Sequence, residues 1–214
     1  SRRQRQMCIR DSNEVGVFYN ELDNSDFGSV IANDNGALSV GAYGWHGNNA
    51  LSLLRKAYSI SNAEINRVAL SYSNTGRKVI AAITNGSDWS SYVPDSYTCS
   101  CIKAMLLTNA GIEAQNQTST ENAEEYIAIC QENNINDKRA IVYCADILNQ
   151  FGTGSFDKNV YGNGHNGVLY GVSNATLDSV YSSKRAWSDS NYSYETRRKW
   201  TYDYLKGLSD TDFS

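Results

Sequence analysis

The chain has 214 residues, of which 41% are hydrophobic, 20% charged and 11% aromatic, a composition typical of a globular protein rather than a disordered one. Its net charge of −4 argues against a nucleic-acid-binding protein, because phosphate neutralisation needs a basic face. No run approaches the roughly 20 apolar residues of a membrane span, and the N-terminus lacks the apolar core of a signal peptide.

The first residues, SRRQRQMCIRDS, resemble a translated sequencing adaptor. We therefore expect residues 1–12 to lie outside the fold and a single domain to occupy residues 13–214. Without Cys8, four cysteines remain, and apolar neighbours on the chain favour reduced core thiols at Cys130 and Cys144. No metal site is predicted, since Cys99 and Cys101 are too close in sequence for a zinc pair and the chain has 2 histidines.

Apolar spacing predicts a first short helix over residues 15–22, with Glu21 near its C-terminal end. Residues 23–47 are rich in turn formers and contain one short stretch, SVGAY, with strand-like alternation. Asn48 resembles the N-cap of the next helix, with Trp45 and His46 at its start. Further helices are predicted over residues 63–71, 78–83, 98–110, 121–133, 137–151, 173–182 and 194–208, with a glycine-rich break at 152–171. The sequence therefore predicts a mainly α (α+β) fold.

Two carboxylates stand out as a possible glycosidase pair. Cleavage of a glycosidic bond commonly uses one protonated carboxyl group on the leaving oxygen and one ionised carboxylate on water or carbon. Glu21, beside apolar residues at a helix end, suits the acid, and Asp34, in the polar run NDNG, suits the base. Composition alone favours the plainer alternative, in which Asp34 is a turn residue and Glu21 a solvated helix acid.

The run SVIANDNGALSVGAYGWHGNNALSLL is similar to the motif of phage endolysin-type peptidoglycan hydrolases of the lysozyme superfamily. It also resembles the chitosanase signature, in which a catalytic Asp is followed five residues on by Thr or Ser and seven residues on by Gly; Asp34, Ser39 and Gly41 keep those offsets. Two later stretches, RAIVYCADILNQFG and YETRRKWTYDYLKGL, resemble helices of the same family. Gly44 stands where a Gln often precedes the Trp, and the interval between Glu21 and Ser29 is longer than in many relatives.

The resemblance implies a lysozyme-like, two-lobed helical domain with a small β or extended element, residues 27–43, beside a cleft. It makes Glu21 the general acid, with Glu14 as its rival, Asp34 the base and Ser39 the hydroxyl that positions water. The substrate-binding residues that it implies are Asn35, Tyr43, Trp45, His46, Asp146 and Gln150. The alternatives are a core position for Trp45, a capping or loop contact for His46, and surface positions for Asp146 and Gln150.

The implied reaction is hydrolysis of β-1,4 bonds in bacterial peptidoglycan with inversion and without a cofactor. The implied setting is a phage-encoded or secreted enzyme that acts on the bacterial cell wall. Three alternatives stay open: a chitosanase, a non-catalytic glycan-binding or phage structural module, and a hydrolase that pairs Cys99 or Cys101 with His165 to cut peptide stems.

Overall fold

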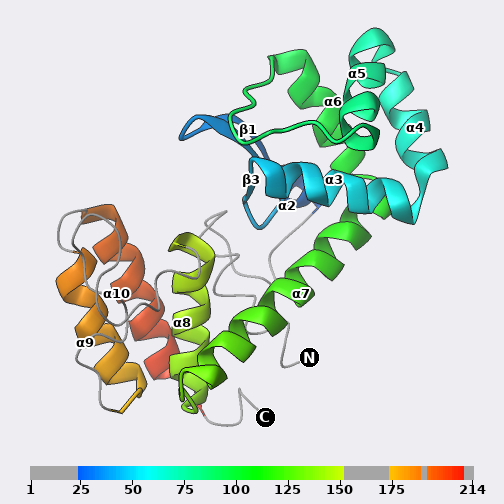
Figure 1. The fold of residues 1–214 in the computed structure, drawn as a ribbon. Coiled ribbons are helices and arrows are strands. Elements are labelled where there is room, and N and C mark those ends of the chain that lie inside the picture. Colours follow the sequence, from blue (N-terminus) through cyan, green and yellow to red (C-terminus); the bar gives the residue numbers. More distant parts are fainter. Residues whose placement is uncertain (1–23, 152–173, 189–191, 210–214) are drawn as a thin grey trace. The chain divides into compact units, whose positions relative to one another are not determined.

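The computed structural model describes residues 24–151, 174–188 and 192–209 (Figure 1). The predicted N-terminal tail, the first predicted helix, Glu14, Glu21 and His165 lie outside the described residues. Helices dominate the described residues, and one small antiparallel sheet accompanies them, which confirms the predicted mainly α class. Within the described residues, no helix combines the length and the apolar character that crossing a membrane requires.

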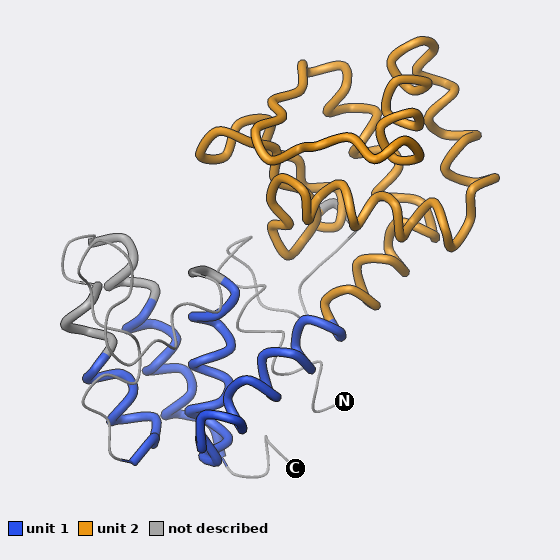
Figure 2. The backbone as a smooth tube through the Cα atoms, viewed as in Figure 1, with its two compact units in different colours: residues 1–13, 120–214 blue, residues 14–119 orange. Residues whose placement is uncertain are grey.

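The chain forms two compact units, shown in Figure 2. Unit 2 comprises residues 14–119, and unit 1 comprises residues 1–13 and 120–214. The elements of unit 2 are α2 (Asn24–Phe27), β1 (Val30–Asp34), β2 (Ala37–Val40), β3 (Trp45–His46), α3 (Asn48–Ile60), α4 (Asn62–Leu70), α5 (Ser73–Thr84) and α6 (Ser96–Leu106). Helix α7 (Asn109–Glu132) begins in unit 2 and ends in unit 1, which also contains α8 (Lys138–Phe151), α9 (Leu177–Ser188) and α10 (Tyr192–Gly207).

The sheet has the strand order β1-β2-β3, and both pairs are antiparallel. Strands β1 and β2 form a hairpin whose two-residue turn is Asn35-Gly36, since Asp34 pairs with Ala37. Both turn residues have positive φ, 50° for Asn35 and 98° for Gly36, as a type I′ turn requires. The residues 27–43, predicted to contribute a small β or extended element, therefore contain this hairpin.

The hairpin turn supplies a stability prediction. Gly36→Ala is expected to lower the free energy of unfolding by about 1 kcal/mol, because an alanine is strained at positive φ. No atom lies within 4 Å of the position of the added Cβ at Gly36, so backbone strain accounts for the whole effect. Urea denaturation would measure it, with Gly207→Ala as the control, because Gly207 has equal room and ordinary φ. Equal stability of Gly36→Ala and the wild type would contradict the turn assignment.

The helices of unit 2 pack through apolar stripes. In α3, Leu51 and Leu54 are almost fully buried, and each such side chain contributes about 1.5–3 kcal/mol on leaving water. Helix α4 starts at an N-cap serine, Ser61, whose side chain accepts a hydrogen bond from Glu64 N at 3.3 Å. Helix α6 starts at Asp95, which accepts a hydrogen bond from Thr98 N at 2.7 Å. In all three helices the apolar residues of the sequence pattern are buried, and polar side chains cap the starts of α4 and α6.

The start of α3 differs from the sequence prediction. Trp45 and His46 form strand β3 instead of the start of a helix. Asn48 is the first residue of α3 and not its N-cap; its side chain holds the segment before α6, accepting from Trp89 N at 2.7 Å and donating to Asp88 Oδ1 at 2.9 Å. The side-chain amide of Asn48 therefore bonds to residues distant in the sequence instead of capping its own helix.

Helix α7 is one continuous helix of 24 residues, where the sequence predicted the end of one helix and the start of another. Its first turn is capped from outside the helix. Glu64 of α4 accepts hydrogen bonds from Asn109 N at 3.1 Å and from Ala110 N at 3.0 Å. A carboxylate at this end satisfies free N–H groups and matches the positive end of the helix dipole.

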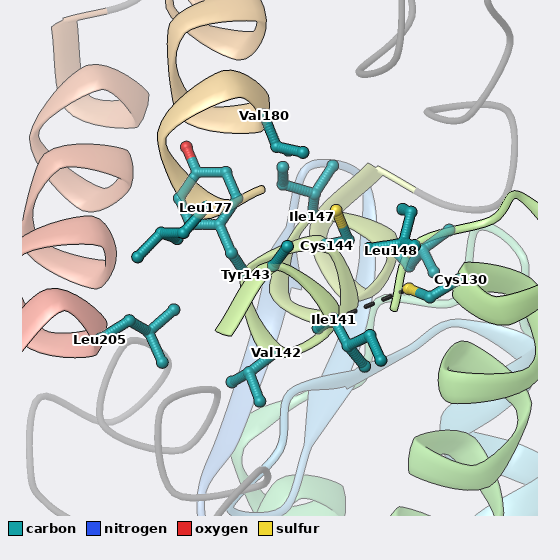
Figure 3. Packing of buried hydrophobic residues seen from close by; sticks show 12 residues of the cluster. Cys130, Ile141, Val142, Tyr143, Cys144, Ile147, Leu148, Leu177, Val180 and Leu205 are labelled. Atoms are coloured by element: carbon teal, nitrogen blue, oxygen red, sulfur yellow. Dashed lines mark hydrogen bonds between the residues drawn. The ribbon is translucent and has the colours of Figure 1, made fainter. Parts of the chain in front are cut away.

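Unit 1 has its own apolar core, shown in Figure 3. Helix α8 supplies most of its buried side chains, α9 contributes Leu177 and Val180, and α10 contributes Leu205. Arg139, at the start of α8, fastens the end of α10 by donating to Leu205 O at 3.2 Å and Leu208 O at 2.6 Å. The segments predicted as helices at 137–151 and 194–208 therefore meet in one helical unit.

Candidate active site on the β-hairpin of unit 2

The small sheet of unit 2 places three of the predicted site residues on one face. Ser39 on β2 pairs directly with His46 on β3, so their side chains point to the same side. Asp34 pairs with Ala37, two residues before Ser39, which makes Asp34 and Ser39 diagonal neighbours. The register shift between Ile31 and Asp34 is the irregularity that brings Asp34 into this position.

The Asp34 carboxylate is oriented by the Ser39 hydroxyl. Ser39 Oγ donates to Asp34 Oδ2 at 2.7 Å, and Ser39 is buried while Asp34 is half-buried. The other carboxylate oxygen, Oδ1, accepts a hydrogen bond from Asn35 Nδ2 at 3.1 Å on the exposed side. The serine hydroxyl keeps its own lone pairs after this donation. The carboxylate and the hydroxyl therefore lie side by side, where one water molecule could hydrogen-bond to both.

The turn itself is closed by a different residue. Asn33 Oδ1 accepts the hydrogen bond from Gly36 N at 2.9 Å. Asp34 directly precedes the turn, but its carboxylate does not accept the hydrogen bond from Gly36 N, so the structure places the side chain that accepts from the turn backbone at Asn33 rather than at Asp34. Asp34 also forms no ion pair with any residue of the described ranges. Its carboxylate stays accessible at the hairpin tip.

His46 contacts the backbone of the same hairpin. Its Nε2 lies 2.8 Å from the Asp34 carbonyl oxygen, and its side chain is exposed. A carbonyl oxygen only accepts, so Nε2 carries the hydrogen in this contact. The imidazole therefore connects β3 to the end of β1, so its partner is a strand residue rather than a loop or a helix end.

Tyr43 and Trp45 are core residues. Their side chains are 1% and 4% exposed, and their rings meet edge to face with centroids 5.0 Å apart. Burial removes both ring faces from solvent, so the structure gives no support to the predicted stacking of a sugar on either ring. The core alternative for Trp45 is the one that the structure matches.

One residue that sequence reasoning missed holds the base of the hairpin. Gln115 of α7 is fully buried and accepts a hydrogen bond from Ala42 N at 3.1 Å through Oε1. Its Nε2 donates to Phe27 O at 3.1 Å and to Leu106 O at 3.3 Å. Gln115 thereby joins the segment before β1 and the segment after β2 to the helices. The sequence signal for a buried glutamine was its position four residues from two small residues, Gly111 and Ser119, on one helix face.

Gly41, which keeps the third offset of the chitosanase-like signature, lies directly beside Gln115. Its φ is 76°, and an added Cβ would lie 2.5 Å from Gln115 Oε1 and 3.1 Å from the Trp45 ring. Both the backbone conformation and the space therefore require glycine here. In the structure, Asp34 supplies a carboxylate, Ser39 supplies the hydroxyl that orients it, and Gly41 forms the turn after β2 beside Gln115.

Two further predicted residues, Asp146 and Gln150, lie on α8 in unit 1. The Asp146 carboxylate is buried and forms an ion pair with Arg198 of α10 at 2.6 Å, with both side chains 1% exposed. Thr201 Oγ1 lies 3.4 Å from the same carboxylate oxygen. The surface position considered for Asp146 is wrong, and its ion pair gives no support to a substrate contact. The side chain of Gln150 lies outside the part of the chain that the structure describes.

The thiols do not resemble activated nucleophiles. The four described cysteines are free, and burial raises the pKa of Cys101 to about 11. Burial also raises the pKa of Cys99. A raised pKa lowers the fraction of reactive thiolate at neutral pH, which weakens the alternative of Cys-His chemistry. The described ranges contain no group of three or more His, Cys, Asp and Glu side chains placed to hold a metal ion.

Comparisons with protein families, curated proteins and solved structures give no match for this chain.

Proposed function

We propose that the chain is a glycoside hydrolase with a lysozyme-like fold that cleaves β-1,4 bonds of an amino-sugar polymer, with bacterial peptidoglycan as its substrate. The observation that carries the proposal is the 2.7 Å hydrogen bond from Ser39 Oγ to Asp34 Oδ2, on a carboxylate that forms no ion pair within the described residues. The resemblance of the surrounding motif to phage endolysins supports the choice of substrate and a phage-encoded or secreted enzyme that acts on the wall.

In the proposed reaction, water held by Ser39 and Asp34 attacks the anomeric carbon, and Asp34 takes its proton. Glu21, assigned from the sequence motif, donates a proton to the leaving oxygen as the glycosidic bond breaks. The configuration at the anomeric carbon inverts, because one displacement occurs from the face opposite the leaving group. Positioned acid and base groups of this kind typically contribute 10²–10⁴-fold each to the rate.

The test uses purified bacterial cell walls, with turbidity and newly formed reducing ends followed together. The proposal predicts that walls clear with new reducing ends, that Glu21→Gln loses both, and that iodoacetamide pretreatment of the protein changes neither. Clearing without reducing ends, or loss of activity on alkylation, would instead indicate cleavage of peptide stems. If the folded protein is inactive on walls but releases reducing ends from chitosan, the proposed reaction is correct and the substrate is chitosan instead of peptidoglycan. Inactivity on both polymers would contradict the proposal and favour a binding module.

A further inference from the structure

A second feature of unit 2 has the dimensions of a ligand site. A cavity of about 400 Å³ lies between α5 and the segment 85–95 that leads into α6. This volume falls within the range of about 300–1,000 Å³ typical of small-molecule sites. None of the predicted catalytic or substrate-binding residues lines the cavity. The proposed hydrolytic chemistry therefore leaves it without a role.

The wall of the cavity is fixed by hydrogen bonds from three directions. Leu38 N of β2 donates to Tyr92 O at 2.8 Å, and Trp89 N donates to the Asn48 side chain of α3 at 2.7 Å. Asp95 caps α6 through Thr98 N at 2.7 Å. A wall held in this way loses little conformational freedom on binding, which favours affinity.

Two stacked aromatic rings line the cavity. The rings of Trp89 and Tyr92 are 28° from parallel, with centroids 4.8 Å apart. Trp89 is 3% exposed, whereas Tyr92 is half-buried. Trp89 stacks on Tyr92, and Tyr92, the more exposed of the two rings, contributes a flat apolar surface to the lining of the cavity.

Charged groups of both signs complete the lining. Asp88 and Asp95 present carboxylates that accept hydrogen bonds, and Lys78 of α5 presents an ammonium group that donates them. Hydrogen bonds from Ser90 and Asn48 lower the pKa of Asp88, which keeps it an acceptor at neutral pH. Lys78 is exposed and makes no hydrogen bond or ion pair within the described ranges, so its donors are available. A flat apolar surface with both acceptors and a donor around it suits a ring that carries hydroxyl and carbonyl groups.

We propose that this cavity binds one pyranose unit of an amino-sugar chain, with its apolar face on Tyr92, its hydroxyl groups on the Asp88 and Asp95 carboxylates, and its amide carbonyl on Lys78. The choice of an amino sugar rests on the proposed function, whereas the preference for a polyhydroxylated ring comes from the cavity itself. The site would anchor the polymer without taking part in bond cleavage.

Titration with the β-1,4-linked trimer of N-acetylglucosamine, followed by tryptophan fluorescence, tests this proposal. Ala82→Leu places a larger side chain in the cavity on a helix that tolerates leucine, and we expect it to weaken binding at least about 10-fold. Lys78→Met removes the donor and is expected to weaken binding about 3- to 10-fold. Arg77→Met is the matched control, because Arg77 is the exposed neighbour on α5 that does not line the cavity, and its affinity should equal that of the wild type.

Absence of saturable binding, or equal affinity in Ala82→Leu and the wild type, would overturn the proposal. The β-1,4-linked trimer of glucose, which is uncharged and lacks the acetamido group, should bind more weakly and be insensitive to Lys78→Met. If it bound more tightly than the acetylated trimer, the assigned role of Lys78 would be overturned. Binding is measured without turnover, so it separates the two proposals: a cavity that binds in a protein inactive on walls and chitosan upholds this site and contradicts the hydrolase.

Discussion

Gln115→Ala is expected to lower the free energy of unfolding by about 3–4 kcal/mol. The substitution removes the partner of Ala42 N and of Phe27 O in a place that water does not reach. Each buried polar group left without a partner costs about 1–3 kcal/mol, and the cavity left by the lost side chain adds to that. Urea denaturation followed by circular dichroism measures the change.

Gln117→Ala is the matched control for this prediction. Gln117 lies two residues further along α7 and is exposed, and its amide donates to Glu113 Oε1 of the same helix at 2.7 Å. Its removal should change stability by less than about 0.5 kcal/mol. Similar losses for Gln115→Ala and Gln117→Ala would show that the hairpin does not depend on Gln115. Under our account Gln115→Ala also lowers activity in the fraction that stays folded, because the hairpin that carries Asp34 loses its anchor.

Asp146→Ala is expected to destabilise the protein by about 3–5 kcal/mol, because it leaves the buried guanidinium of Arg198 without this carboxylate. The exposed pair of Lys199 and Asp203, on the same helix as Arg198, supplies the control. Asp203→Ala should leave stability nearly unchanged, since solvent screens an exposed pair. Urea denaturation again provides the comparison.

A double variant distinguishes the lost ion pair from lost packing. Asp146→Leu alone buries an uncompensated positive charge, whereas Asp146→Leu with Arg198→Met removes both charges. We expect the double variant to be more stable than Asp146→Leu alone. If the double variant were the less stable of the two, the guanidinium would be stabilised mainly by other neighbours, and the assigned role of Asp146 would be wrong.

Local patterns were sufficient for much of the helical structure. The apolar spacing of α4 and α8 is strong, and their predicted positions match the structure to within about two residues. Helix α7 was missed over its first half because Asn, Gln, Thr and Ser fill it and its buried positions are small or polar, such as Ala114 and Ser119. Because the buried side chains are small or polar, the sequence of this half has no hydrophobic periodicity that would predict a helix.

The hairpin was within reach of sequence reasoning but was described only as a small β or extended element. Asn35-Gly36 is the dipeptide most typical of a type I′ turn, and this turn fixes the pairing of Asp34 with Ala37. The turn role of Asn33, in contrast, was not distinguishable from one for Asp34, since both are turn formers.

Long-range contacts account for what the sequence did not show. The partners of Gln115 lie 73 and 88 residues away along the chain, so no local pattern marks it as an anchor. Asp146 and Arg198 are 52 residues apart, and their pairing appears only once α8 and α10 have packed. Composition does not separate a buried, paired charge from a surface one.

The most direct test of our central claim is the initial rate at which reducing ends appear from purified cell walls with the wild type, Asp34→Asn and Asp203→Asn at equal amounts of folded protein. We predict that Asp34→Asn keeps the wild-type fold and loses at least about 100-fold in rate, because an amide does not take the proton of the attacking water. Asp203→Asn, an exposed substitution in unit 1, should keep the full rate. A folded Asp34→Asn variant that releases reducing ends at the wild-type rate would contradict the assignment of Asp34 as the catalytic base.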